Sequence, residues 1–88
     1  MDYRTLLPAL EAPRSEYVSE SVSVREIVMA GLDWPTSYWP ELAVAWLEDG
    51  APMDNDIADL LLRIADTKTF PQNLRHRSAA LARKWSRR

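Results

Sequence analysis

The sequence predicts an all-α fold, a compact bundle of four to five short helices built on helical hairpins. Apolar residues recur at helical spacing, capping residues precede these stretches, and the two glycines follow them. The 88 residues suffice for one domain, and 47% hydrophobic with 27% charged residues is typical of a globular chain. We expect residues 22–88 to form a single helical domain and residues 1–21 to form a partly ordered N-terminal arm.

The arm contains one short apolar pattern. Leu6, Leu7 and Leu10 have the spacing of a helical turn, which Pro8 and Pro13 interrupt. The arm can therefore pack on the domain or fray, and the sequence leaves both alternatives open.

The first helix is predicted from a capping box. Ser23 precedes Val24 and is followed three residues later by Glu26, so its side chain can accept a hydrogen bond from the Glu26 backbone. We expect the helix to run from Val24 to about Ala30, with Gly31 as the left-handed residue that ends it.

A connector rich in aromatic residues follows. It contains two Trp-Pro pairs, and proline disfavours helix in the residue before it. Trp34, Tyr38 and Trp39 therefore cluster around a non-helical segment. Such residues either fill the core of a small domain or contact a partner, and both alternatives remain open.

The second helix is predicted to begin after Ser37 and to end near Asp49, with Gly50 just beyond. More than half of its circumference is apolar, so we expect a central helix that is packed on two sides and places Trp46 in the core. The linker from Gly50 to Met53 is short, which predicts an antiparallel hairpin with the third helix.

The third helix is predicted to follow Asp54 as N-cap and to run from Asn55 to about Asp66. Asp59 and Arg63 stand four residues apart, which predicts an ion pair. The apolar stripe of this helix consists of Ile57, Leu60, Leu61 and Ile64, with Leu62 at the margin.

The fourth helix is predicted from a second capping-box pattern, formed by Thr69 and Gln72, and runs to about Ser86. Most positions outside its narrow apolar stripe are basic. The stripe consists of Leu74, Ser78, Leu81 and Trp85.

Charge is segregated along the chain, although the net charge is only −2. Residues 1–67 contain all 13 acidic residues and four arginines, whereas residues 68–88 contain seven lysines and arginines and no acidic residue. Either the basic helix pairs with the acidic helices of its own domain, or it forms an interaction surface.

We expect a small non-enzymatic protein-interaction module, an adaptor or regulator. Its partner would be a protein with an acidic surface or a second copy of the chain. The alternative is a nucleic-acid-associated protein that binds phosphates through the same basic helix, although the acidic remainder of the molecule would oppose this. The candidate partner-binding residues are Arg75, Arg77, Arg83, Lys84 and Arg87 of the basic helix and Trp34, Tyr38 and Trp39 of the connector.

We predict no catalytic site, no cofactor and no metal site. His76, the single histidine, lies among basic residues and has no carboxylate near it in sequence to orient it. Asp54, Asp56 and Asp59 are typical of a helix start, and they lack the glycine and the distal glutamate of a calcium-binding loop. The chain has no cysteine and therefore no thiolate nucleophile or ligand.

The sequence also predicts a location. No segment approaches the ~20 apolar residues that a membrane span needs, and the first residues do not have the pattern of a signal peptide. The absence of cysteine is compatible with a reducing compartment. We therefore expect a complete cytoplasmic protein without a membrane partner.

Overall fold

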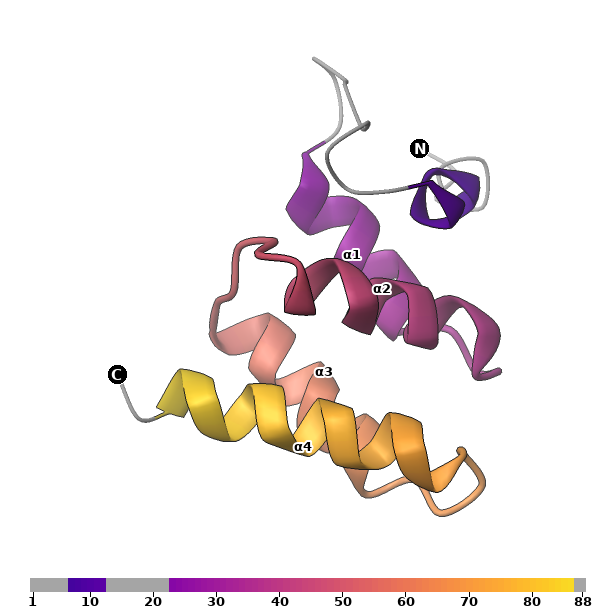
Figure 1. Cartoon of the computed structure of the whole chain (residues 1–88), viewed down its shortest axis with the longest axis vertical. Helices are drawn as coiled ribbons and strands as arrows, with labels where there is room; N and C mark the ends of the chain where they lie inside the picture. Colours follow the sequence, from indigo (N-terminus) through magenta and orange to yellow (C-terminus); the bar gives the residue numbers. More distant parts are fainter. Residues whose placement is uncertain (1–6, 13–22, 87–88) are drawn as a thin grey trace.

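The computed structural model describes residues 7–12 and 23–86, and every regular element in these two stretches is helical (Figure 1). The predicted all-α bundle is therefore confirmed. Its elements are the 3-10 helix η2 (Leu7–Glu11) and the helices α1 (Val24–Leu32), α2 (Tyr38–Glu48), α3 (Asn55–Ala65) and α4 (Gln72–Ser86). The predicted boundary between arm and domain, at residues 21 and 22, lies outside the described residues.

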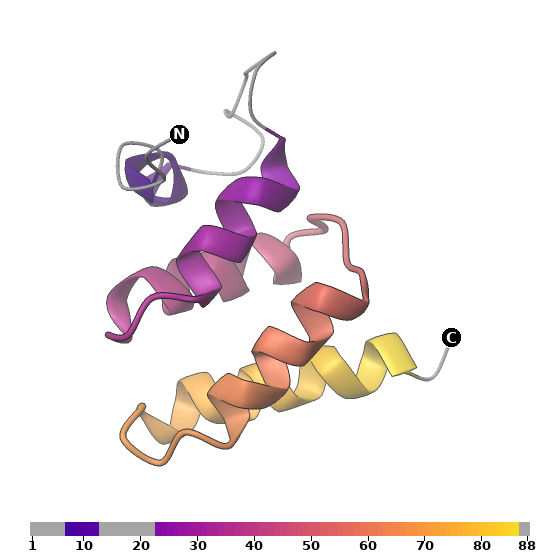
Figure 2. The same cartoon turned by 180° about the vertical axis from the view of Figure 1, so that it is seen from behind.

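Two helical hairpins stack on each other. α1 packs against α2, and α3 packs against α4. The helices of each pair run in roughly opposite directions (Figures 1 and 2). Across the stack, α1 contacts α3 and α2 contacts α4. The Cα radius of gyration of 12.1 Å agrees with the roughly 12 Å expected for a compact chain of this length.

The hairpin predicted between α2 and α3 does not form as a packed pair. α2 packs against α1 and α4, so it is central as predicted. α3 packs against α1 and α4 instead of α2. A non-helical stretch, residues 51–54, carries the chain from one helix to the next. A short linker limits the distance between two helix ends, but the apolar faces decide which helices pack.

The core fills the space between the two hairpins, and all four α-helices contribute to it. Trp46 is 3% exposed, which confirms its predicted core position. Ser78 is completely buried in the fourth helix, and its hydroxyl donates to the Leu74 carbonyl at 2.8 Å, so its burial leaves no hydroxyl donor unpaired. Further completely buried side chains are Ile27, Val28, Val44, Ile57, Leu61 and Leu74.

The short helix η2 is packed rather than frayed. Leu7 and Leu10 are each 2% exposed and join the core against α1 and α2. The Trp46 indole N–H donates to the Ala12 carbonyl at 3.0 Å. Between the two alternatives for the arm, residues 7–12 therefore adopt the packed one.

Two of the helix starts have the predicted caps. The Ser23 hydroxyl accepts from the Glu26 backbone N–H at 3.2 Å, and an Asp54 carboxylate oxygen accepts from the Ile57 N–H at 2.9 Å. Ser37 does precede α2, but its side chain makes no capping hydrogen bond. Asp54 and Ser23 therefore act through their side chains, whereas Ser37 marks the helix start by position alone.

The start of α4 differs from the prediction. Thr69 lies inside a turn in which the Phe70 N–H donates to the Thr67 carbonyl at 3.0 Å. The helix begins at Gln72, and the Pro71 carbonyl accepts its first hydrogen bond, from the Arg75 N–H at 3.1 Å. Thr69 belongs to this turn and is therefore not the N-cap. The residue directly before the helix is Pro71.

Gly50 ends α2 as predicted. Its φ of 109° lies in the left-handed region, which favours glycine. The N–H groups of Gly50 and Ala51 donate to the carbonyls of Leu47 and Trp46 at 3.2 and 3.0 Å, respectively. This pair of bonds is the Schellman motif, which satisfies the last carbonyls of a helix.

The left-handed role predicted for Gly31 is wrong, because this glycine lies inside α1, which continues to Leu32. A Cβ atom at Gly31 would lie 2.7 Å from Leu10 Cδ1 and 3.1 Å from Ala43 Cβ. The glycine therefore allows close packing here, because the arm and α2 both approach this point of α1.

Candidate functional site

The basic residues of α4 fall into two groups, and the side chains of the first group bind to neighbouring helices. The Arg77 guanidinium holds the Glu48 carboxylate of α2 through three contacts of 2.6–3.2 Å. These bonds raise the pKa of Arg77 above its ordinary value. Arg75 Nε donates to the Ala65 carbonyl at 3.3 Å, at the negative end of the α3 dipole. Both arginines therefore join α4 to neighbouring helices.

The second group faces solvent. Arg83 and Lys84 are exposed, and within residues 7–12 and 23–86 their side chains have no ion pair or hydrogen bond. They share one side of α4 with His76 and Ala80, since residues four or seven positions apart lie on the same side of a helix. We call His76, Ala80, Arg83 and Lys84 the outer face of α4. Arg87, also predicted to bind a partner, lies outside the described residues.

An acidic face lies on the neighbouring helix α3. Arg63 forms its ion pair with Asp33 at 3.1 Å, so the predicted pairing of Arg63 with Asp59 is wrong. The reason is that Asp33, at the end of α1, reaches Arg63 across the interface of α1 and α3. Asp59 and Asp66 are exposed, and Leu62 between them is 53% exposed. We call Asp59, Leu62 and Asp66 the outer face of α3.

The other acidic residues of α3 hold the fold together. Arg25 of α1 contacts the Asp54 carboxylate through Nε and the Asp56 carboxylate through Nη2, the latter at 2.9 Å. The Ile57 N–H and then Arg25 stabilise the charged form of Asp54 and lower its pKa. Asp54 therefore caps α3, and both carboxylates attach this helix to α1.

The aromatic residues of the connector do not form one exposed patch. Trp34 and Trp39 are half-buried and pack against the core, whereas Tyr38 is 51% exposed. The Tyr38 hydroxyl donates to Glu11 of the arm, which raises the pKa of Tyr38. The Tyr38 and Trp39 rings meet edge to face, with centroids 4.8 Å apart. Tyr38 is thus the connector aromatic that solvent reaches most.

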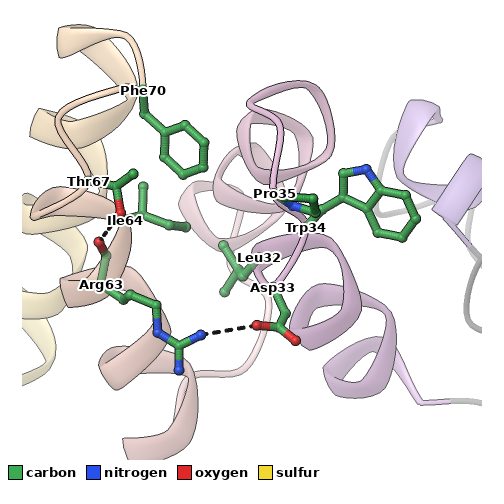
Figure 3. A pocket seen from close by; sticks show the side chains of 8 residues that line it. All are labelled: Leu32, Asp33, Trp34, Pro35, Arg63, Ile64, Thr67 and Phe70. Atoms are coloured by element: carbon green, nitrogen blue, oxygen red, sulfur yellow. Dashed lines mark hydrogen bonds and ion pairs between the residues drawn. The ribbon is translucent and has the colours of Figure 1, made fainter.

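A pocket of about 220 Å³ opens between the connector and the turn after α3 (Figure 3). The Arg63–Asp33 ion pair lies along one side, and the Trp34 ring points away from Phe70. Small-molecule sites usually measure roughly 300–1,000 Å³, so this pocket has the size for one side chain of a partner. Its lining residues are Leu32, Asp33, Trp34, Pro35, Arg63, Ile64, Thr67 and Phe70.

Neither a metal-ligand cluster nor a membrane helix occurs in the described part of the chain. No group of three or more histidine, aspartate or glutamate side chains there could hold a metal ion. None of its helices combines the length and the apolar character that crossing a membrane requires.

Sequence reasoning missed Glu48, Asp33 and Phe70. Glu48 is 29 positions from Arg77, and Asp33 is 30 positions from Arg63. Spacing rules for a single helix do not reach that far. Phe70 belongs to the capping-box pattern, which gives no sign that its ring lines a pocket.

Comparison of the chain with protein-family models, curated proteins and solved structures finds no match.

Proposed function

We propose that this protein is a non-enzymatic protein-interaction module, an adaptor or regulator, that binds its partner through the outer face of α4. One observation carries the proposal. Arg83 and Lys84 face solvent without an intramolecular partner in the described residues, whereas Arg75 and Arg77 are held by α3 and α2. Internal pairing accounts for half of these four cations and leaves the other two available.

An acidic protein surface is the partner chemistry that this face favours. Exposed charges at an interface steer the partner and fix its orientation, and buried aromatic or apolar groups supply most of the affinity. Tyr38 and the pocket beside Phe70 are the second contact in this proposal, since that pocket admits one side chain.

Nucleic acid fits the same face less well. The carboxylates of Asp59 and Asp66, one helix away, would repel a phosphate backbone. Trp85 is half-buried and its indole N–H donates to Asn55 at 3.0 Å, so it offers no free platform for base stacking. A cytoplasmic location fits such a module, because a chain without cysteine suits a reducing compartment.

An affinity pull-down from native lysate, with and without nuclease, tests the proposal. The bait is the full chain, compared with the double variant Arg83→Gln and Lys84→Gln. A matched control, Lys68→Gln, removes one positive charge from the exposed connector before α4. Circular dichroism of each bait verifies that the fold is retained.

After nuclease treatment, we expect the wild type and the Lys68→Gln variant to capture a defined protein. The double variant should not capture it. Loss of all capture after nuclease would overturn the proposal in favour of nucleic acid. Equal capture by the double variant would also overturn it, because the outer face of α4 would then be dispensable.

A further inference from the structure

We propose that the outer faces of α3 and α4 together form a self-complementary surface that binds a second copy of this chain. This inference rests on the proposed function and identifies its partner. The two faces carry opposite charge on adjacent helices: exposed carboxylates on α3, and Arg83 with Lys84 on α4. Both faces point away from the core, since residues on the opposite side of each helix, such as Leu61 and Leu74, are completely buried.

Two hydrogen bonds define how α3 and α4 are aligned. Trp85 Nε1 donates to Asn55 Oδ1 at one end of the pair, and Arg75 Nε donates to the Ala65 carbonyl at the other end. The helices are therefore antiparallel, as Figure 2 shows. Each residue advances a helix by about 1.5 Å, which places Asp59 within roughly 3 Å of the level of Arg83 along the pair.

The same alignment holds along the rest of the surface. Leu62 lies within about 3 Å of the level of Ala80, and Asp66 lies within about 3 Å of the level of His76. Acidic, apolar and acidic positions on α3 are thus nearly level with basic, small and imidazole positions on α4.

A two-fold axis that runs parallel to α3 and α4, along the line between them, brings the outer faces of two copies together. The rotation places α3 of one copy over α4 of the other without changing the level of any residue along the axis. Asp59 then faces Arg83, Leu62 faces Ala80, and Asp66 faces His76. Because the symmetry repeats every contact, each attractive pair occurs twice.

Charge complementarity favours a second copy over other occupants. A polyanion attracted by Arg83 would be repelled by Asp59 and Asp66. A polycation attracted by these two aspartates would be repelled by Arg83. A second copy presents both signs in the matching order. Its net charge of −2 adds little overall repulsion. Leu62, one of two large hydrophobic side chains exposed in the described residues, lies in the centre of the surface.

The size of the surface predicts a weak dimer. Two helices side by side, with α4 about 22 Å long, offer a footprint of roughly 400 Å² per copy. Stable interfaces bury about 1,200–2,000 Å² in total. We therefore expect self-association that appears at high protein concentration and disappears at high salt.

Sedimentation equilibrium of the full chain tests this inference at about 0.05 M and 0.5 M salt. The probes are wild type, Asp59→Lys, Arg83→Glu and an equimolar mixture of the two variants. Each variant alone places like charges opposite each other in both halves of the dimer. In the mixture, the lysine introduced at position 59 of one copy faces the glutamate introduced at position 83 of the other. The second contact of that mixed dimer then joins the unchanged Arg83 to the unchanged Asp59.

We expect the wild-type mass to rise from 10.1 kDa towards twice that value with concentration at low salt only. Each variant alone should dimerise at least about tenfold more weakly, and the mixture should recover the wild-type affinity. A wild type that stays monomeric at low salt would overturn the inference, and so would variants that dimerise like the wild type or a mixture that does not recover. Capture of a different acidic protein by a monomeric wild type would overturn this inference alone, because the proposed function would still hold.

Discussion

The outer surfaces of the two helical hairpins differ in how far other parts of the chain cover them. The hairpin of α1 and α2 is covered by its own chain: η2 packs on both helices, and Trp46 and Tyr38 donate to Ala12 and Glu11 of that arm. The hairpin of α3 and α4 has no such cover in the described residues, and its outer faces keep their charges in solvent. Within the described residues, the arm therefore covers the first hairpin, whereas the surface that we propose for binding lies on the second.

Two leucines express this difference most directly. Leu10 of the arm is 2% exposed, whereas Leu62 of α3 is 53% exposed. Both belong to helical segments with apolar neighbours in the sequence. The burial of a leucine in this protein therefore depends on whether another part of the chain covers it, and so does its expected contribution to the free energy of unfolding.

The largest effect that we predict comes from truncating these leucines. Leu10→Ala should lower the free energy of unfolding by about 2–5 kcal/mol, because it leaves a cavity against α1 and α2. Leu62→Ala should change it by less than about 0.5 kcal/mol. Chemical denaturation of both variants under identical conditions measures the difference, and equal losses would contradict the comparison of the two hairpins.

A smaller effect should separate two helix caps, one in each hairpin. Asp54→Ala removes the carboxylate that caps α3 and should destabilise the protein by about 1 kcal/mol. Ser37→Ala, in front of α2, should change the stability little, because its side chain makes no capping bond. Thermal denaturation of both variants measures the two effects. A loss of stability at Ser37 as large as that at Asp54 would show that the capping bond does not separate them.

The carboxylate of Asp54 also predicts a pH dependence. Its pKa is lowered below its ordinary value of about 4 by the Ile57 N–H and by Arg25. A lowered pKa in the folded state stabilises the protein above that ordinary value, and this contribution is lost as the pH falls through the folded pKa. We expect wild type to exceed Asp54→Asn in stability at neutral pH, with a gap that closes under acid conditions.

Asparagine is a suitable control for this measurement, because it still accepts the capping hydrogen bond but does not titrate. Denaturant unfolding at several pH values between neutral and acid measures the gap. A gap that stays constant over this range would mean that ionisation of Asp54 contributes nothing to folding.

The smallest effect should distinguish the two groups of cations on α4. Arg77→Gln breaks the contacts with Glu48 and should cost at most about 1 kcal/mol, less at high salt. Arg83→Gln should leave the melting temperature unchanged, because its side chain has no partner in the described residues. Scanning calorimetry at low and high salt compares the two. A salt-dependent loss at Arg83 would show that its charge is used within the domain.

The candidate site could be predicted from the sequence only in part. The segregated charge directed attention to α4, and Arg83 and Lys84 do face solvent there. Nothing in the local pattern separated them from Arg75 and Arg77, which belong to the same basic helix. The partners of those two arginines, Glu48 and the Ala65 carbonyl, belong to other helices.

The sequence by itself determined the number and order of the helices and several of their ends. Caps such as Ser23 and Asp54 and the left-handed Gly50 act through hydrogen bonds between residues three to five positions apart, so local spacing specifies them. Tertiary structure alone decided the packing role of Gly31, the pairing of α2 with α1 and α4, and which cations of α4 are held by other helices. The ion pairs that join different helices depend on groups about 30 positions apart, which only the stacking of the two hairpins brings into contact.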